Sequence, residues 1–327
     1  MTQSRPLTWH DTTASWSEYW LSAQTGVLAQ DGSDVVGDMV RYFWISQRPD
    51  FAASHHVVDI GSGNAFLATV LYPDKFSDST CPQWTCIDIA QVHLPTTHLH
   101  LANRVSILAN TNFETALASE LRADWLVSSF GLEYTDLELA PAVCKKNLGP
   151  GGQCLFLMHS TNSLIHRQSL SELGDILFLT EESDVFAAAA QLLPYMAASK
   201  LASWIPDVLA DAARRRYNLA VDAVKRRISL GNSVSVPLMQ VLTALQKILH
   251  QVTVTSTESA VQWVVDLKRT MSRTAIRIQN MTEVALDADA IEALARRFDM
   301  HGFKVNAVTF LSCPLGEVGW VFRARRN

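Results

Sequence analysis

The feature that most constrains the fold is the stretch VVDIGSGNAF at residues 57–66. An apolar run that ends at Ile60 is followed by Gly61, Ser62 and Gly63 and then by the helical pattern AFLATVLY. This order predicts a buried strand, a glycine loop and a helix. Because glycine lacks a Cβ atom, the loop can turn tightly and lie close to a ligand, and the N–H groups that open the next helix attract anions. The stretch therefore predicts a cofactor site at the first turn of an α/β fold.

Two classes of cofactor use loops of this kind. Dinucleotide sites have the pattern G-x-G-x-x-G/A, and here Phe66 occupies the last position, where a bulky ring opposes close packing of helix against strand. Asp59 fits a second pattern, D-x-G-x-G-x-G, as DIGSGNA, with Ala65 in place of the third glycine. The second pattern resembles motif I of the class I S-adenosylmethionine (SAM) dependent methyltransferases. A nicotinamide-dependent oxidoreductase is the alternative enzyme.

Apolar runs after the loop predict four more strands, at 84–91, 105–110, 125–128 and 153–158. Asp88 comes at the end of the second strand, where an acidic residue in nucleotide-binding α/β folds accepts hydrogen bonds from ribose hydroxyls. The sequence LGPGG at 148–152, before the fifth strand, is a second point of similarity to the methyltransferases. Ligands of open α/β sheets bind outside the carboxyl ends of the strands, so residues that follow these runs are candidates for the site.

The resemblance implies SAM as cofactor, S-adenosylhomocysteine (SAH) as product, and no metal. Together with the loop and the sheet edge, it predicts cofactor contacts from Asp59, Gly61, Ser62, Gly63, Asp88, Ile89, Asn110, Thr111, Asn112, Ser129, Phe130 and Tyr19. Of these, Asn110, Thr111 and Asn112 are expected near the adenine, and Phe130 is expected to form a wall of the site.

Candidate catalytic residues follow the fourth and fifth strands. His159 comes at the end of the fifth strand, where a histidine is a candidate general base or hydrogen-bond partner of the methyl acceptor. Glu133 and Tyr134 are alternative candidates, and Trp20 and His166 are candidates for contact with the substrate. The implied reaction is direct methyl transfer to oxygen or nitrogen of a small molecule, which mainly requires that the acceptor be aligned with the methyl group.

The fold predicted from these patterns is a doubly wound, mostly parallel sheet of seven strands, the last antiparallel. Four regions are expected: an N-terminal helical lid at 1–50, the first part of the SAM-binding core at 51–162, a helical insertion between strands five and six at 163–283, and the last helix with strands six and seven at 284–327. Finer elements are expected as helices at 13–28 and 34–46, a helix capped by Asp289, and strands at 303–311 and 318–325. The insertion is expected to be a substrate cap, with a homodimer contact or a purely stabilising layer as the alternative role.

Composition narrows the choice of partner. The formal charge of −5 provides no basic field for phosphates, so we expect no nucleic acid partner. No apolar run reaches the roughly 18 residues of a membrane span, and the N-terminus lacks a secretory signal, so we expect a cytoplasmic protein without a membrane partner. The five cysteines form no C-x-x-C pair, which predicts reduced thiols and no zinc site.

Two other functions remain open at this point. A non-catalytic SAM-binding or scaffold protein would keep the same loop, because fold does not determine activity. A nucleic acid methyltransferase is opposed by the acidic balance and by the absence of an Asn/Asp-Pro-Pro-Tyr motif after the fourth strand.

Overall fold

The computed structural model describes residues 9–22, 35–73, 81–116, 121–200, 208–230, 235–252 and 256–327. The chain divides into two compact units, one formed by residues 1–167 with 280–327 and the other by residues 168–279. The first unit contains the sheet, and the second is helical.

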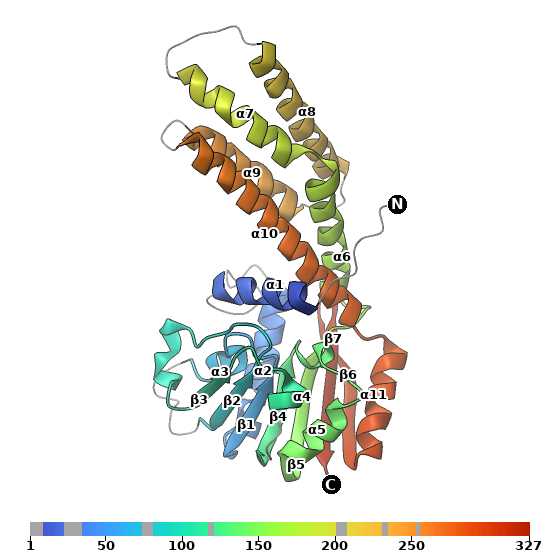
Figure 1. The fold of residues 1–327 in the computed structure, drawn as a ribbon. Coiled ribbons are helices and arrows are strands. Elements are labelled where there is room, and N and C mark those ends of the chain that lie inside the picture. The colour runs from blue at the N-terminus through green and yellow to red at the C-terminus, as the bar shows by residue number, and fades with distance from the viewer. Residues whose placement is uncertain are drawn as a thin grey trace. The chain divides into compact units, whose positions relative to one another are not determined.

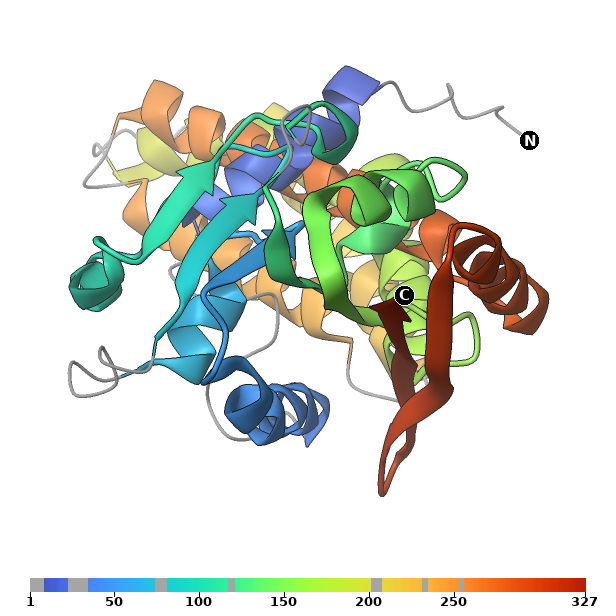
Figure 2. The same ribbon diagram turned by 90° about the horizontal axis from the view of Figure 1, so that it is seen from below.

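The sheet of the first unit has seven strands in the order β3-β2-β1-β4-β5-β7-β6 (Figures 1 and 2). Its strands are β1 His56–Ile60, β2 Gln83–Ile87, β3 Val105–Leu108, β4 Ala123–Ser129, β5 Leu148–Met158, β6 Phe303–Cys313 and β7 Gly316–Arg326. The pairs among β1 to β5 are parallel, and β7 is antiparallel to β5 and β6. The predicted mostly parallel sheet with an antiparallel last strand is confirmed. The strand order reverses between β1 and β4, which is where open α/β sheets bind ligands.

Helices cover both faces of the sheet and complete two hydrophobic cores. On one face, α2 Val35–Phe51 and α3 Phe66–Leu71 pack Trp44 and Leu71 against the strands. On the other face, α5 Ala140–Asn147 and α11 Ala288–Met300 contribute Cys144 and Phe298. The two faces are therefore both apolar, which explains why the central strands are continuous hydrophobic runs without alternation.

Several boundaries differ from those predicted. β5 begins at Leu148, because residues of LGPGG extend the strand beside β4 from the Ala123–Leu148 pair onward. The cap of α11 is Asp287 and not Asp289, since the Asp287 carboxylate accepts the N–H of Ala290. At the N-terminus, α1 spans Trp9–Ser22, so it begins earlier than expected, and α2 continues beyond residue 46 to Phe51. Residues 23–28 of the first expected helix lie outside the described residues.

The second unit is built from amphipathic helices around its own core. Its elements are α6 Leu164–Leu177, a π-helical turn at Phe178–Glu182, α7 Val185–Lys200, α8 Val208–Leu230, α9 Val236–Gln251 and α10 Thr257–Val284, with the first turn of α6 and the last residues of α10 belonging to the first unit. Val224, Leu245 and Val264 are buried at the centre of this core. Among the described helices, no segment is both long and apolar enough to cross a bilayer.

Candidate active site

The loop between β1 and α3 lies in direct backbone contact with the loop after β4. Gly61 has φ +65°, and a Cβ atom there would lie 2.6 Å from the Cα atom of Gly131. Gly63 has φ +52°, and a Cβ atom there would lie 2.4 Å from the ring of Trp20 in α1. Both positions therefore require glycine, because the backbone is left-handed and because neighbouring atoms occupy the space of a side chain.

Asp88 connects this loop to the end of β2. One carboxylate oxygen accepts the N–H of Gly63 at 2.7 Å, and the other accepts the N–H of Ala90 at 2.8 Å. Burial raises the pKa of Asp88 to about 6, while the two backbone hydrogen bonds act in the opposite direction. Each oxygen keeps a second lone pair, so the carboxylate can accept hydrogen bonds from a ligand as well.

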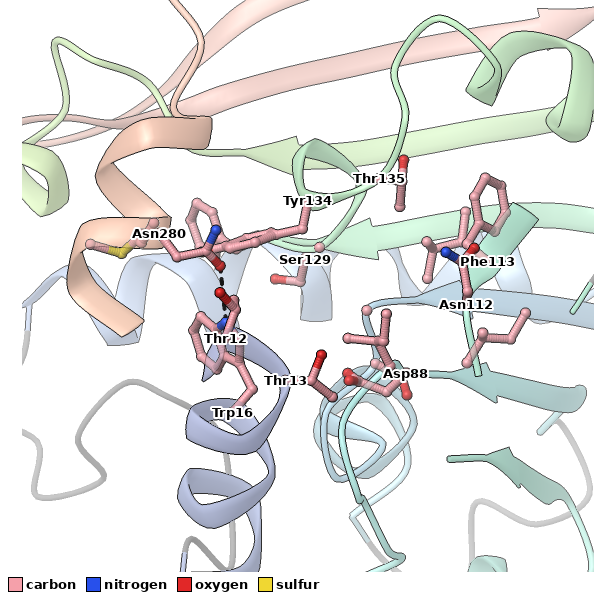
Figure 3. Close-up of a pocket in the computed structure, with 18 of the residues that line it drawn as sticks. Thr12, Thr13, Trp16, Asp88, Asn112, Phe113, Ser129, Tyr134, Thr135 and Asn280 are labelled. Atoms are coloured by element: carbon pink, nitrogen blue, oxygen red, sulfur yellow. Dashed lines mark hydrogen bonds between the residues drawn. The ribbon is translucent and has the colours of Figure 1, made fainter. Parts of the chain in front are cut away.

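A cavity of about 520 Å³ opens at the carboxyl ends of the strands, in the size range of small-molecule sites (Figure 3). Eleven of the residues predicted from sequence line it: Trp20, Gly61, Ser62, Asp88, Ile89, Thr111, Asn112, Ser129, Phe130, Tyr134 and His159. Segments that are far apart in the sequence are thus brought to one site, although the binding role of each residue stays a prediction.

Six predicted residues lie outside the lining of the cavity: Asp59, Gly63, Asn110, Glu133, Tyr19 and His166. Asn110 donates from its side chain to Gln91 at 2.7 Å, which leaves Thr111 and Asn112 as the residues of that turn at the cavity. Tyr19 packs edge-on against Trp16 and Trp20.

His166 and Asp59 lie in elements next to the cavity without lining it. His166 lies in the first turn of α6, and its backbone N–H donates to Ser163 at 3.0 Å. Asp59 is buried in β1 between Cys86 of β2 and Val127 of β4, and neither of its carboxylate oxygens has a hydrogen-bond partner in the described part of the chain. Burial, and then the nearby charge of Asp88, raises the pKa of Asp59 well above its ordinary range.

His159 forms one wall of the cavity together with two aromatic rings. The imidazole stacks on Phe130 at 4.4 Å between ring centroids and meets Tyr134 edge-on at 6.2 Å. The backbone of Phe130 is held at φ +58°, a strained conformation for a residue with a side chain, and its N–H donates to Leu157 at 2.7 Å. The strained residue is thus one that lines the cavity.

Burial controls the charge of His159 and of its neighbour Glu133. It lowers the pKa of His159 to about 3, with a smaller effect from His166, and Nδ1 of His159 has no hydrogen-bond partner among the described residues. Burial raises the pKa of Glu133 to about 8, and Oε1 of that carboxyl group accepts the backbone N–H of His159 at 2.7 Å. Near pH 7 the imidazole is therefore uncharged and the Glu133 carboxyl group is mostly protonated.

Helix α1 contributes residues that sequence patterns did not single out. Thr12, Thr13 and Trp16 line the cavity, and the indole N–H of Trp16 donates to Oδ1 of Asn280 at 3.2 Å (Figure 3). Asn64 is a second omission, because its buried carboxamide donates to the backbone oxygen of Trp20 at 2.8 Å. The position of Asn64 inside the glycine loop could have identified it from sequence, whereas no local sequence pattern identifies Asn280.

The described residues contain no group of three or more His, Cys, Asp or Glu side chains that could hold a metal ion.

Comparisons with known proteins give matches to solved structures alone. No family model matches the chain. No curated protein matches it either. A SAM dependent methyltransferase from Archaeoglobus fulgidus is 15% identical over 40% of this chain and 57% of its own, with a TM-score of 0.31. The N-methyltransferase NodS from Bradyrhizobium japonicum, solved with SAH, is 17% identical over 44% of this chain and 72% of its own, with a TM-score of 0.32.

A third similar structure comes from work on the conversion of a disulfide bond into a thioacetal group during echinomycin biosynthesis. It is 12% identical over 97% of this chain and 92% of its own, with a TM-score of 0.41. Solved structures that resemble this chain thus include SAM-dependent methyltransferases. With TM-scores this low, the similarities carry no inference about substrate or mechanism, which must come from the geometry of this chain.

Proposed function

We propose that the protein is a SAM-dependent methyltransferase that acts on a small molecule. The observation that supports this most directly is the glycine loop, which the Asp88 carboxylate holds at the point where the strand order reverses, beside a cavity in the size range of small-molecule sites. In nucleotide-binding α/β folds, the ribose of the cofactor binds to an acidic residue in the position of Asp88.

The charge of the cavity favours SAM over a dinucleotide. Its lining residues include the carboxylates of Asp88, Glu114 and Asp136 and neither lysine nor arginine. A pyrophosphate would bring negative charge close to these carboxylates, which costs free energy. A cofactor with a sulfonium and an ammonium group is attracted by the same carboxylates, and the ring of Phe130 adds an aromatic surface that a cation favours.

The residues present fit such a cofactor. Asp88 would hold the ribose hydroxyls, Thr111 and Asn112 would contact the adenine, and Ser129 and Phe130 would lie beside the sulfur. When bound, SAM supplies a methyl group activated by positively charged sulfur. Helix α1, which contributes four residues to the cavity lining, is proposed to act as a lid that excludes water from the site.

His159 would orient the acceptor. Its unpartnered Nδ1 can accept a hydrogen bond from the O–H or N–H group to be methylated, which directs a lone pair of that atom toward the methyl group. The low pKa of His159 makes it a weak base at rest. As the acceptor atom gains the methyl group, its O–H or N–H becomes acidic, and the proton passes to Nδ1 and then to solvent. Glu133 acts as a positioning residue through its hydrogen bond to the His159 backbone.

The test is calorimetric titration of the protein with SAM, SAH and NAD, repeated on Asp88→Ala. We expect binding of the adenosyl ligands and an affinity about tenfold to hundredfold lower in Asp88→Ala, because hydrogen bonds to a charged group are lost. Asp222→Ala, an exposed aspartate of α8, is the matched control and should bind as the unaltered protein does. Binding of NAD in preference to SAM, or no binding of either adenosyl ligand, would refute the proposal.

A further inference from the structure

The cavity has a second end, away from the residues assigned to the cofactor. Asp88 and Asn112 lie on the right of the view in Figure 3, whereas Trp16, Tyr134 and Asn280 gather on the left. If the ribose and adenine lie along Asp88 and the β3 edge, the sulfur end of the cofactor points toward the loop after β4. The acceptor must then occupy the space beside Tyr134, His159, Trp16 and Asn280, which we call the acceptor subsite.

Direct contacts connect the four residues of the acceptor subsite. The Trp16 indole N–H donates to Oδ1 of Asn280 at 3.2 Å, and the Trp16 ring meets the ring of Tyr134 edge-on at 5.7 Å. Tyr134 in turn meets His159 edge-on at 6.2 Å. Three rings and one carboxamide thus hold one another in place, and such mutual packing preorganises a surface for a flat ligand.

None of these four side chains carries a charge, because the imidazole of His159 is neutral near pH 7. Ile165 and Met281, which also line the cavity, are apolar. An ion that entered this subsite would lose its hydration and meet no opposite charge among these six side chains, which costs free energy. A cationic acceptor would also be repelled by the sulfonium, and an anionic one by the carboxylates elsewhere in the lining.

Asn280 contributes the directional element of the subsite. Its Oδ1 accepts from Trp16, and this bond determines which way the carboxamide faces. The two N–H donors of Nδ2 make no hydrogen bond to another described residue, and Asn280 lines the cavity. A ligand in the cavity therefore meets an amide donor at this position.

We propose that the acceptor is an uncharged aromatic compound that lies against Trp16 and Tyr134, presents a carbonyl or ether oxygen to Nδ2 of Asn280, and presents the group to be methylated to His159. Asn280 is then a residue that determines specificity. The inference rests on the proposed function, because it depends on where the cofactor lies.

The test uses three probes with the same ring and hydroxyl group. These are 4-hydroxyacetophenone, which is uncharged, 4-hydroxybenzoate, which is an anion, and tyramine, which is a cation. Binding of each is measured by calorimetry with the full-length protein saturated with SAH. We expect 4-hydroxyacetophenone to bind at least about tenfold more tightly than either ion, since burial of an unpaired charge is the larger cost.

Asn280→Asp tests the amide donor. The substituted carboxylate can still accept the Trp16 N–H, but it offers no N–H to a carbonyl group. We expect it to weaken 4-hydroxyacetophenone binding at least about tenfold and to leave SAH binding unchanged. Asn306→Asp, an exposed position on β6 outside the cavity lining, makes the same change of charge and should have no effect.

The comparison of the three probes on the unaltered protein needs no variant, so it stands even if Asn280→Asp fails to fold. Equal affinities, a preference for either ion, or no binding of 4-hydroxyacetophenone would overturn the inference. Unchanged 4-hydroxyacetophenone binding in a folded Asn280→Asp would overturn the role of Asn280. Failure of the protein to bind SAH would count against the proposed function instead, so the two failures are distinguishable.

Discussion

At the scale of single residues, the charge of the candidate site is set by the burial of two neighbouring ionisable groups, Glu133 and His159. Glu133 is 4% exposed and His159 is 7% exposed, and a backbone N–H joins the two at 2.7 Å. Burial disfavours the charged form of each group, so near pH 7 the Glu133 carboxyl group is mostly protonated and the His159 imidazole is neutral. The imidazole that lines the cavity at the proposed acceptor subsite is therefore uncharged.

The pH dependence of stability should show the effect of Glu133. Its pKa is about 8 in the folded protein against an ordinary value of 4.5, so its stabilising contribution is complete below pH 4.5 and is lost as the pH rises toward 8. Glu133→Gln removes this titration. We expect the variant to be more stable than the unaltered protein at pH 8.5 by about 1 to 3 kcal/mol and equal to it at pH 4, as measured by urea unfolding.

His159 acts in the opposite direction and provides an internal check. Its pKa is about 3 against an ordinary value of 6.5, so its contribution is present above pH 6.5 and is lost as the pH falls toward 3. This acid limb should be the same in the unaltered protein and in Glu133→Gln. Glu292→Gln, an exposed position on α11, should leave the whole profile unchanged. An equal gain for Glu133→Gln at pH 4 and pH 8.5 would contradict a burial effect on the charged form.

At the scale of elements, α1 is attached to the glycine loop and to the turn after β2. The ring of Trp20 fills the space beside Gly63, Asn64 donates to the Trp20 backbone oxygen, and the Gln91 N–H donates to the Ser17 hydroxyl at 2.9 Å. The proposed lid and the glycine loop are therefore packed together, and a substitution in the loop should disturb the packing of α1.

Two opposite substitutions in this loop test that coupling. Gly63→Ala places a Cβ atom against the Trp20 ring at a left-handed backbone position, and we expect it to destabilise the first unit by about 2 kcal/mol or more and to weaken SAH binding. Ala65→Gly is the matched control, because Ala65 has φ +57° and glycine relieves that strain. It should retain SAH binding and stabilise by up to about 1 kcal/mol. Thermal unfolding and SAH titration measure both, and an unaffected Gly63→Ala would contradict the contact.

At the scale of the whole molecule, the two units have separate hydrophobic cores. Every buried residue of the helical core lies between Leu179 and Val264, and both cores of the sheet unit are built from the remainder of the chain. Cores that share no buried residues can unfold separately, as subglobal cooperative units do.

Differential scanning calorimetry should accordingly show two transitions. A ligand that binds only the folded first unit stabilises it by about 2.7 kcal/mol at a concentration 100 times its Kd, so SAH should raise one transition and leave the other unchanged. Leu294→Ala should lower the transition that responds to SAH, and Val224→Ala should lower the other, since each side chain is fully buried in its own core. A single transition, or a shift of both with SAH, would show that the units unfold together.

Much of the sheet unit could be predicted from local patterns. The apolar run before Gly61 predicts the strand and the loop, because strand periodicity and glycine geometry act over a few residues. The position of Asp88 at the end of a strand likewise predicts that it lies at the cavity, where the structure has it. Boundaries were less predictable. The capping role of Asp287 and the early start of β5 depend on which of several local hydrogen bonds the folded chain selects.

The order of strands and helices along the chain and the glycine loop can be predicted from sequence, since both follow from short-range backbone preferences and burial periodicity. The contacts of the proposed acceptor subsite depend on the fold. Trp16 and Asn280 are 264 residues apart, so no local pattern connects them. The pKa values of His159 and Glu133 were likewise decided by burial, because desolvation depends on everything packed around a group and not on its neighbours in sequence.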